Sequence, residues 1–600
     1  MIDPAVGPLD AAWVARKHTS YDELSAARGA LWWLQSDPEQ GGNRRLVRYR
    51  TGERPEVVTP PELSVGGWLH AYGGGAYAVG TDRLWVVSEA DSLVYEISDD
   101  GASRLVVPAG EGFAYGDLHA TDLGLLAVRG SECGDELVTI DSDTATVHRL
   151  LASDGFLGAP RVSEGRIAYL EWDADAMPWD SSRLFVAGLT DGGLLGPASL
   201  IAGGVGESVV EPLWGPDGAL HFLSDRSGWW NLYAWDGTTA RTVSPCEADF
   251  APAPWEGGYQ SYAFLTDGGM ALTMHDGFTS DLTLLTPNGH RIRPETGLTS
   301  IKPYIAVYGE VIAVIGSSPN STPRIRLIPR EASDSHAVET IDVPATVEAT
   351  PTTGIPRVRR ASWAGHEVSY LLHQPLGSDH AGPVPLLVRA HPGPTDSVPL
   401  RLDWTVQFFT SRGFAVAEVA YRGSTGQGRA FRQALNGHWG EFDVEDCSAV
   451  AKQLLVDGIA LPGAVFITGA SAGGYTALQA ATVGGPFSGA TATSAIIDPQ
   501  LWTKTAPRFQ RPHAESLAGP AGAVRAEHIQ IPVLLIHGTG DEIAPAADSQ
   551  RLSAQLDALG KEHRAVFLDG VGHYLSSPAS LRTALEAEWA FYKELMAAQR

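Results

Sequence analysis

The chain has 600 residues, 44% of them hydrophobic and 19% charged. That length is more than one hydrophobic core organises, so two or more domains are expected. The formal net charge of −27 repels phosphate backbones and argues against nucleic-acid binding. No run of about 18 or more apolar residues occurs, and the first residues lack a basic segment followed by an apolar one, so we expect neither a membrane span nor a secretory signal.

The three cysteines, Cys133, Cys246 and Cys447, lie far apart in the sequence. A sparse, odd set does not form a disulfide framework and fits a reducing compartment, so a cytoplasmic protein is expected. Histidines and acidic residues do not cluster at metal-ligand spacings. We therefore expect no metal and no organic cofactor.

Residues 29–345 have the pattern of β structure. Short apolar or alternating runs recur between Gly, Asp and Asn turns with a period of about 45 residues, the size of a four-stranded propeller blade. The clearest unit is residues 216–237, PDGALHFLSDRSGWWNLYAWDG. Its first turn precedes a strand, and its second turn separates that strand from the next one. Seven such units between residues 29 and 343 predict a seven-bladed β-propeller, with an array of β-sandwiches as the alternative.

Residues 346–600 alternate strand and helix, after a linker rich in Pro and Thr at 344–358. Continuous apolar strands between amphipathic helices predict a mostly parallel, doubly wound sheet with both faces covered. The expected strands are VPLLVRA, FAVAEVA, AVFITGA, ATATSAII, PVLLIHG and HRAVFLD, and the expected helices include VEDCSAVAKQLLVDG, YTALQAATV and the C-terminal SLRTALEAEWAFYKELM.

Gly469–Gly473 matches the pattern G-x-S-x-G around Ser471. In a chain with 67 glycines the pentapeptide alone means little, but here the strand AVFIT precedes it and the helical run YTALQAATV follows it. A serine on a tight strand-to-helix turn is the nucleophile elbow of α/β-hydrolases, in which the flanking glycines permit close packing. The C-terminal domain is therefore predicted to be an α/β-hydrolase with Ser471 as its nucleophile.

A serine nucleophile needs a base and a group that orients that base. In this fold the acid and then the histidine follow the serine, each in a loop after a strand. Asp541 follows PVLLIHG and His573 follows HRAVFLD. His573 is expected to act as general base and then general acid, with Asp541 orienting its ring. Asp498 also follows a strand and is the alternative acid, whereas His537 closes a strand and is expected to pack or to form hydrogen bonds.

The oxyanion of an acyl-transfer reaction needs two preorganised donors. One is expected to be the backbone N–H of Ala472, directly after the nucleophile. The other is expected in the loop His391–Pro394, which follows the strand VPLLVRA. Because prolines lack an N–H, Gly393 is the expected donor of that loop, unless the loop is a simple Pro/Gly turn.

With these residues placed, the C-terminal half resembles the prolyl oligopeptidase family of serine peptidases, in particular its acylaminoacyl-peptidase and dipeptidyl-aminopeptidase-like branch. The N-terminal half also resembles this family. The segments that carry the resemblance are HPGPT (391–395), FFTSRGFAVAEVAYRGSTGQGRAFRQAL (408–435), HWGEFDVEDC (438–447), GASAGGYTAL (469–478), LLIHGTGDEIAP (534–545) and GVGH (570–573), together with MPWDSSRL (177–184) and SDRSGWWNLY (224–233).

The resemblance implies a propeller that caps the hydrolase and admits only short peptides to an active site between the two domains. It also implies that residues 1–28 pack on the hydrolase domain. Members of the family range from monomers to larger assemblies, so a homo-oligomer stays open as an expectation.

Three departures from the family pattern concern substrate binding. Pro392 replaces a glycine of the oxyanion loop, while Gly393 is kept. Ile543 stands where the family often has an arginine that binds a substrate carbonyl, which favours a short acyl side. Ala71, in the segment His70–Gly74, stands where related bacterial members often have a glutamate. If that glutamate binds a substrate amine, another acidic residue must do so here. The candidates are Glu171, Asp173, Asp175, Glu247 and Asp249.

The sequence thus predicts a serine exopeptidase that hydrolyses short peptides or aminoacyl amides near the amino terminus through an acyl-enzyme. The alternatives are an acylaminoacyl peptidase, a puromycin-type aminoacyl amidase and an esterase. An apolar substrate pocket is expected from Tyr475, Trp502, Phe509 and Ile543, although the aromatic residues among them could equally belong to the core.

Overall fold

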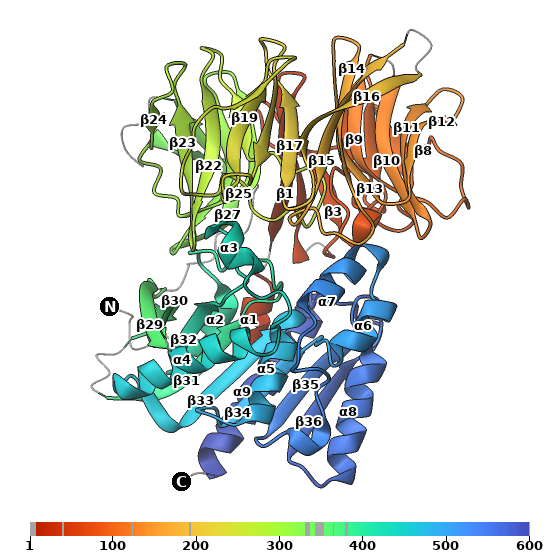
Figure 1. Ribbon diagram of the computed structural model, residues 1–600. Coiled ribbons are helices and arrows are strands. Elements are labelled where there is room, and N and C mark those ends of the chain that lie inside the picture. Colours follow the sequence, from red (N-terminus) through yellow and green to blue (C-terminus); the bar gives the residue numbers. More distant parts are fainter. Residues whose placement is uncertain are drawn as a thin grey trace.

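The computed structural model describes residues 8–17, 19–38, 41–122, 124–190, 194–330, 337–341, 353–363, 365–377 and 382–598. The chain folds into two domains, a β-propeller and an α/β domain, which lie one on top of the other (Figure 1). The short helices α3, α6 and α7 of the α/β domain lie at the side that faces the propeller.

The propeller has seven sheets of four consecutive strands among the described residues, which confirms the predicted architecture. In chain order the blades are β1 (Ser20–Ala27), β2 (Ala30–Ser36), β3 (Arg44–Tyr49), β4 (Glu56–Val57); β5 (Tyr77–Val79), β6 (Leu84–Val87), β7 (Val94–Ile97), β8 (Ser103–Leu105); β9 (Ala114–Thr121), β10 (Gly124–Ser131), β11 (Gly134–Asp141), β12 (Thr146–Ser153); β13 (Phe156–Ser163), β14 (Arg166–Trp172), β15 (Arg183–Leu189), β16 (Leu195–Gly203); β17 (Val209–Trp214), β18 (Leu220–Ser224), β19 (Asn231–Trp235), β20 (Ala240–Thr242); β21 (Tyr262–Phe264), β22 (Met270–Asp276), β23 (Thr279–Leu285), β24 (Arg291–Ile292); and β25 (Ser300–Tyr308), β26 (Val311–Ser318), β27 (Ser321–Pro329), β28 (Glu339–Thr340).

Carboxylates on the first strands of two blades each bond to a neighbouring blade, either to its first strand or to the residue just before that strand. Asp117 Oδ2 accepts from the amide of Ala159 at 2.6 Å, and Glu23 Oε2 accepts from the amide of Ala76 at 2.7 Å. Both carboxylate-bearing residues have positive φ at a β-bulge, and a bulge turns the side chain toward the neighbouring blade. Each bond satisfies a buried amide between blades.

The first blade begins at Ser20, earlier than the predicted boundary at residue 29. The segment SYDELSAA alternates buried and partly exposed residues and pairs with β2, which the short apolar runs used for the prediction did not reveal. The preceding helix α1 (Ala11–Ala15) packs against α2 and α9 of the α/β domain. The predicted boundary at residues 345–346 lies outside the described residues.

The second domain is built on an eight-stranded sheet of order β29-β30-β32-β31-β33-β34-β35-β36. From β32 to β36 neighbouring strands are parallel, while β29 and β30 add an antiparallel edge. The strands are β29 (Arg357–Trp363), β30 (His366–His373), β31 (Val384–Ala390), β32 (Ala415–Ala420), β33 (Ala460–Ala470), β34 (Gly489–Thr493), β35 (Val533–Gly538) and β36 (His563–Leu568). The helices are α2 (Trp404–Thr410), α3 (Gly428–Gln433), α4 (Phe442–Val456), α5 (Ala472–Val483), α6 (Pro499–Thr505), α7 (Arg511–Leu517), α8 (Ala546–Ala558) and α9 (Pro578–Ala598).

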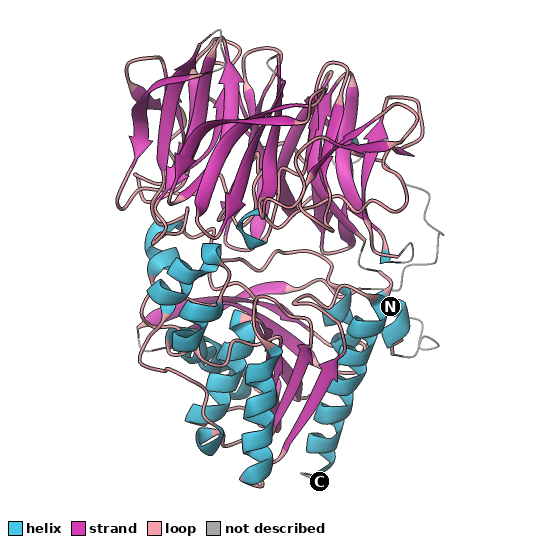
Figure 2. Ribbon diagram, turned by 90° about the vertical axis from the view of Figure 1, so that its right-hand side faces the viewer, coloured by secondary structure: helices cyan, strands magenta, loops and turns pink. Residues whose placement is uncertain are grey.

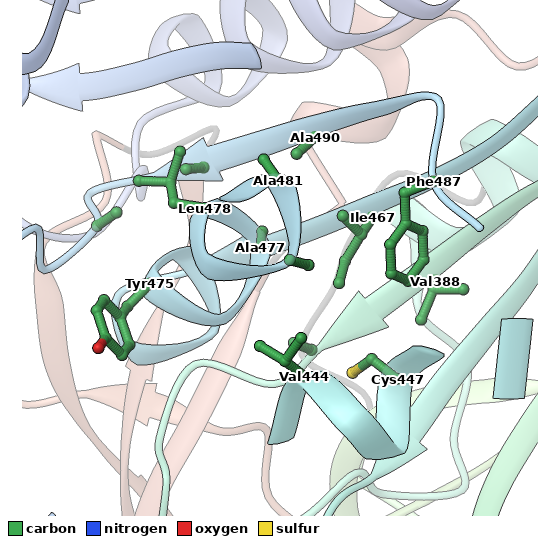
Figure 3. Close-up of a cluster of buried hydrophobic side chains, with 14 of the residues drawn as sticks. Val388, Val444, Cys447, Ile467, Tyr475, Ala477, Leu478, Ala481, Phe487 and Ala490 are labelled. Carbon is green, nitrogen blue, oxygen red and sulfur yellow. The ribbon is translucent and has the colours of Figure 1, made fainter. Parts of the chain in front are cut away.

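Alternate residues of the central strands supply the cores on the two faces of this sheet. Val388 of β31 belongs to the cluster under α4 and α5, which includes Val444 and Leu478 (Figure 3). The next residue back, Leu387, belongs to the opposite cluster under α2 and α9 with Phe591. Both faces are covered by helices, as the continuous apolar strands predicted.

Loops lie between the two domains (Figure 2), and buried ionic contacts also join the domains. Asp225 of the propeller is fully buried and accepts from Arg429 and Arg432 of α3, at 2.6 Å each. On another side, Arg508 donates to Asp135 at 2.8 Å. A buried carboxylate with two guanidinium partners is strongly destabilised when those partners are lost, so this contact fixes how the propeller sits on the hydrolase sheet.

Candidate active site

Ser471 lies between the end of β33 and the start of α5, with φ 52° and ψ −117°. This strained conformation is the nucleophile elbow that the sequence predicts. A Cβ atom on Gly473 would come within 2.4 Å of the Ala390 carbonyl oxygen, and one on Gly469 within 2.2 Å of the Gly473 carbonyl oxygen. Glycine is therefore required at both positions for helix and strand to pack this closely.

Asp541 lies in the loop after β35 and is held by four donors. Its Oδ1 accepts from the amides of Ile543 and Ala544, at 2.9 Å each. Its Oδ2 accepts from His573 Nδ1 at 2.8 Å and from His537 Nε2 at 3.1 Å. Burial by itself raises the pKa of Asp541, but the bonds from the two histidines outweigh burial and hold the pKa well below its usual range. Asp541 is thus a permanent anion beside His573.

The contacts of His537 fix its tautomer. Its Nε2 lies near two acceptors, Asp541 Oδ2 and the Ala544 carbonyl oxygen at 2.8 Å, so this nitrogen carries the proton. Its Nδ1 then accepts from the Ser549 hydroxyl at 2.8 Å. His537 therefore orients Asp541. The sequence predicted packing or hydrogen bonding for His537 but did not identify Asp541 as its partner.

Ser471 and His573 line one cavity of about 450 Å³. Within the described residues no hydrogen bond joins their side chains, an arrangement often found before substrate tightens a catalytic pair. Because Nδ1 of His573 donates to Asp541, Nε2 is the nitrogen left to take the serine proton. The three predicted triad residues thus come together at one edge of the sheet.

The two expected oxyanion donors differ in their bonding. The amide of Ala472 donates to the Pro392 carbonyl oxygen at 3.1 Å. The amide of Gly393 has no hydrogen bond to any described residue, while its carbonyl oxygen is close to His391 Nδ1, at 2.6 Å. A Cβ atom on Gly393 would lie 2.9 Å from that of Asp396, so the loop needs glycine there. The assignment of Gly393 and Ala472 to the oxyanion hole stays a prediction.

The alternative acid, Asp498, is placed elsewhere. Its carboxylate caps α6 by accepting from the amides of Gln500 and Leu501, and no described contact joins it to His573. An N-terminal cap of this kind explains the residue without catalysis.

The four expected pocket residues divide into two groups. Tyr475 is buried against Trp439 and donates to the Gly522 carbonyl oxygen at 2.7 Å. Trp502 is also buried and donates to the Ile543 carbonyl oxygen at 2.9 Å. Phe509 and Ile543 instead line a second cavity, of about 470 Å³, between the propeller and the loop around Arg508. Whether any of the four contacts substrate stays a prediction.

The acidic residues considered as amine ligands do not reach the catalytic cavity. Asp173 forms an ion pair with Arg183 at 2.6 Å. Asp249 is buried and accepts from the amides of Trp230 and Gly428. None of the five candidates lines the cavity that holds Ser471, whereas Asp396, which the sequence analysis did not single out, does.

The described residues contain no group of three or more His, Cys, Asp or Glu side chains that could hold a metal ion. Among the described helices, none combines the length and apolar character needed to cross a membrane.

Known proteins are similar to parts of this chain or to the whole of it. Residues 400–599 match the prolyl oligopeptidase family. The hydrolase domain is thus similar to that family of serine peptidases over most of its length. Among curated prolyl oligopeptidase relatives, dipeptidyl aminopeptidase BIII of Pseudoxanthomonas mexicana is 27% identical over 215 residues, 33% of this chain and 31% of that protein. The acylamino-acid-releasing enzyme of Sus scrofa is 33% identical over 120 residues, 20% of this chain and 16% of that protein. The aligned region thus spans about a third or less of these two relatives.

Solved structures extend the likeness to both domains. A puromycin-hydrolyzing peptidase of Mycobacterium tuberculosis has 26% identity and a TM-score of 0.92, over 98% of this chain and 96% of that one. A puromycin hydrolase has 27% identity and a TM-score of 0.92, over 99% and 97%. An acylaminoacyl peptidase with 14% identity and a TM-score of 0.73 shares the fold.

Proposed function

We propose that the chain is a serine exopeptidase that hydrolyses short peptides or aminoacyl amides near their amino terminus through an acyl-enzyme. The observation that carries this proposal is Ser471 on a strained elbow, in the same cavity as a histidine that a fully bonded aspartate orients. The family and the full-length likeness to puromycin-hydrolysing peptidases support an amide as the bond that is cleaved.

The chemistry follows from the atoms in place. Ser471 Oγ attacks the carbonyl carbon while Nε2 of His573 takes its proton, and the carbonyl oxygen becomes an oxyanion held by the amides of Ala472 and Gly393. His573 then gives the proton to the leaving nitrogen, the C–N bond breaks, and the acyl group stays on Ser471. A water molecule, deprotonated by His573, attacks the ester, and the acid is released with the serine proton restored.

The propeller supplies a size limit in this proposal. It covers the C-terminal edge of the hydrolase sheet, where the site lies, and buried contacts such as those of Asp225 hold it there. A folded protein is therefore expected to be excluded, while short peptides and aminoacyl amides enter.

The test is hydrolysis of matched 4-nitroanilides, with a free amino-acyl group, an N-acetyl amino-acyl group or a dipeptidyl group, beside a simple 4-nitrophenyl ester. Ser471→Ala should lower every rate by a factor of about 10³ or more. The proposal is supported if the parent chain hydrolyses the anilides and Ser471→Ala does not. Turnover of the ester without any anilide would replace it with an esterase, and dominance of the acetylated series would make the protein an acylaminoacyl peptidase.

A puromycin-type amidase is the second candidate, because two of the solved structures that match nearly the whole chain are described as puromycin-hydrolysing. Release of the free amino acid from puromycin by the parent chain, absent in Ser471→Ala, would establish it. A cytoplasmic location and a homo-oligomeric state remain expectations from the sequence.

A further inference from the structure

Ser494 lies directly beside the nucleophile at the carboxyl end of the sheet. Ala470 and Thr493 pair in register as the last residues of β33 and β34. The residues that follow them in the chain are Ser471 and Ser494. The amide of Ser471 donates to the Thr493 carbonyl oxygen at 2.8 Å. The amide of Ser494 donates to the Ile536 carbonyl oxygen of β35, also at 2.8 Å, so its backbone is held in place next to Ser471.

The backbone of Ser494 is strained. Its φ of 46° lies in the left-handed region, which glycine adopts freely and residues with a side chain adopt rarely. Ser471, which follows the neighbouring strand, is strained in the same way, with φ 52°. Strained backbone of this kind persists where the surrounding structure enforces it, and it clusters at active sites. The strained region around the nucleophile thus includes Ser494.

The hydroxyl of Ser494 is buried in the wall of the catalytic cavity. The residue is only 1% exposed, and its Oγ forms no hydrogen bond to any other described residue. Ser494 lines the cavity of about 450 Å³ that Ser471 and His573 also line. A buried hydroxyl without a partner is unfavourable. We therefore expect it to bond to a polar group that enters this cavity.

The cavity extends from the nucleophile to the face of the sheet that α2 and α9 cover, and both helices line it. Its wall there contains Arg389, Asp403 and Glu418. These charged groups already bond to one another, because Arg389 donates to Asp403 at 3.1 Å and to Glu418 at 2.9 Å. A cavity with a polar wall and this volume has room for several water molecules of about 30 Å³ each. Water from this cavity is therefore the polar group that can reach the hydroxyl of Ser494.

We propose that Ser494 Oγ binds the water molecule that hydrolyses the acyl-enzyme. One O–H of this water donates to Ser494 Oγ, and the other gives its proton to Nε2 of His573 as the water oxygen attacks the acyl carbon. The bond between that carbon and Ser471 Oγ then breaks, and the proton on His573 passes to the serine oxygen. Ser494 thus acts in the second step of the reaction and not in the first. This inference rests on the proposed function, whose acyl-enzyme it requires.

The test compares the full chain with Ser494→Ala in the hydrolysis of 4-nitrophenyl acetate. Mass spectrometry of enzyme quenched during steady turnover gives the fraction of chains that carry an acetyl group on Ser471. The turnover rate divided by this fraction is the rate constant of deacylation. We expect Ser494→Ala to lower this constant about tenfold, the effect of one lost hydrogen bond. The rate constant of acylation should stay within about twofold, so the acetylated fraction should rise.

Two further variants separate the hydroxyl of Ser494 from the strain of its backbone. Ser494→Gly removes the hydroxyl and suits a φ of 46°, so it should keep the fold and still slow deacylation about tenfold. Ser488→Ala removes a hydroxyl just before β34, at the end of that strand away from the cavity. It is the matched control and should change neither rate constant.

Unchanged deacylation in Ser494→Ala would overturn the water site, and so would equal losses of acylation and deacylation, which indicate a structural role. A loss of acylation alone would overturn it too, because Ser494 would then bind substrate. A parent chain that hydrolyses the ester but no anilide would refute the exopeptidase proposal, while the two rate constants would still decide the water site. If the parent releases no more 4-nitrophenol than Ser471→Ala does, both proposals are overturned.

Discussion

Asp541 bonds to His573, and Asp396 lines the cavity that His573 shares with Ser471, but the two carboxylates have opposite surroundings. Asp541 accepts four hydrogen bonds, and its pKa is held low. Asp396 accepts one from Ser397, and burial raises its pKa to about 6. A carboxylate that must orient a catalytic base is supplied with donors by the fold itself. A buried carboxylate with few hydrogen-bond donors from the protein is suited to accept hydrogen bonds from a bound ligand.

The largest effect is expected where the bonded carboxylate loses its charge. Asp541→Asn keeps the shape but can no longer act as the anion that orients and stabilises the His573 ring, so kcat should fall by a factor of about 10⁴. Steady-state kinetics on the best anilide measure this, with circular dichroism to confirm the fold. A loss of kcat below about tenfold would show that His573 does not depend on Asp541, and Asp498 would again be a candidate for the catalytic acid.

Asp225 extends the comparison to a carboxylate whose partners come from the other domain. Asp225→Asn leaves Arg429 and Arg432 without their shared anion, and such a loss in a buried site costs about 3–5 kcal/mol. Chemical denaturation of the parent and the variant tests this. Glu132→Gln is the control, because Glu132 pairs with Arg511 across the same interface but is exposed, and it should cost under about 1 kcal/mol. Equal costs for the two variants would mean that burial of the pair is not what matters.

His537 tests whether the donors of Asp541 act on catalysis or only on stability. His537→Gln removes the ring N–H that Asp541 accepts, so kcat/KM should fall by about tenfold, the equivalent of one bond to a charged group. The loss should fall on kcat rather than on KM, because His537 bonds to Asp541 and does not line the catalytic cavity. Ser549→Ala, which touches only the far side of the ring, is the comparison variant. A purely structural role would lower the melting temperature and leave kcat unchanged.

Glu23 is a buried carboxyl in the propeller, and its effect should be the smallest. Burial raises its pKa from 4.5 to about 8, while Arg44 lowers it and Asp22 raises it. The native state therefore holds a proton that the unfolded chain releases between these values, so stability falls as pH rises from 4.5 to 8. Glu23→Gln should remove this loss and gain at least about 1 kcal/mol relative to the parent between pH 5 and pH 8. If the difference in unfolding free energy between the parent and Glu23→Gln is the same at pH 5 and pH 8, the pKa of Glu23 is not raised.

The three predicted triad residues, which the structure brings together, have local signals in the sequence. Ser471, Asp541 and His573 each follow an apolar strand, and parallel strands deliver such loops to one edge. The antiparallel edge strands β29 and β30 were not recognised, because RVRRASW is polar and largely exposed. The helices α6 and α7 were missed because each has only seven residues.

Contacts between the domains had no signal in the sequence pattern. Trp255 of the propeller bonds to Thr395 of the hydrolase domain, and a pattern within either segment does not reveal such a pairing. For the same reason the acidic residues first considered as amine ligands were chosen from turns, and two of them proved to have partners of their own, Asp173 with Arg183 and Asp249 with backbone amides.

The bond from Ala472 to Pro392 has a consequence for the rate of the reaction. In the free protein this amide already has an acceptor, the carbonyl of the loop that also carries Gly393. If Ala472 is the oxyanion donor that we propose, an incoming substrate oxygen must compete with an internal one, and only the difference in strength between the two bonds contributes to binding. A neutral substrate carbonyl gains little from this exchange, whereas a full negative charge gains much more. With that assignment, the loop would favour binding of the tetrahedral intermediate over binding of the ground state.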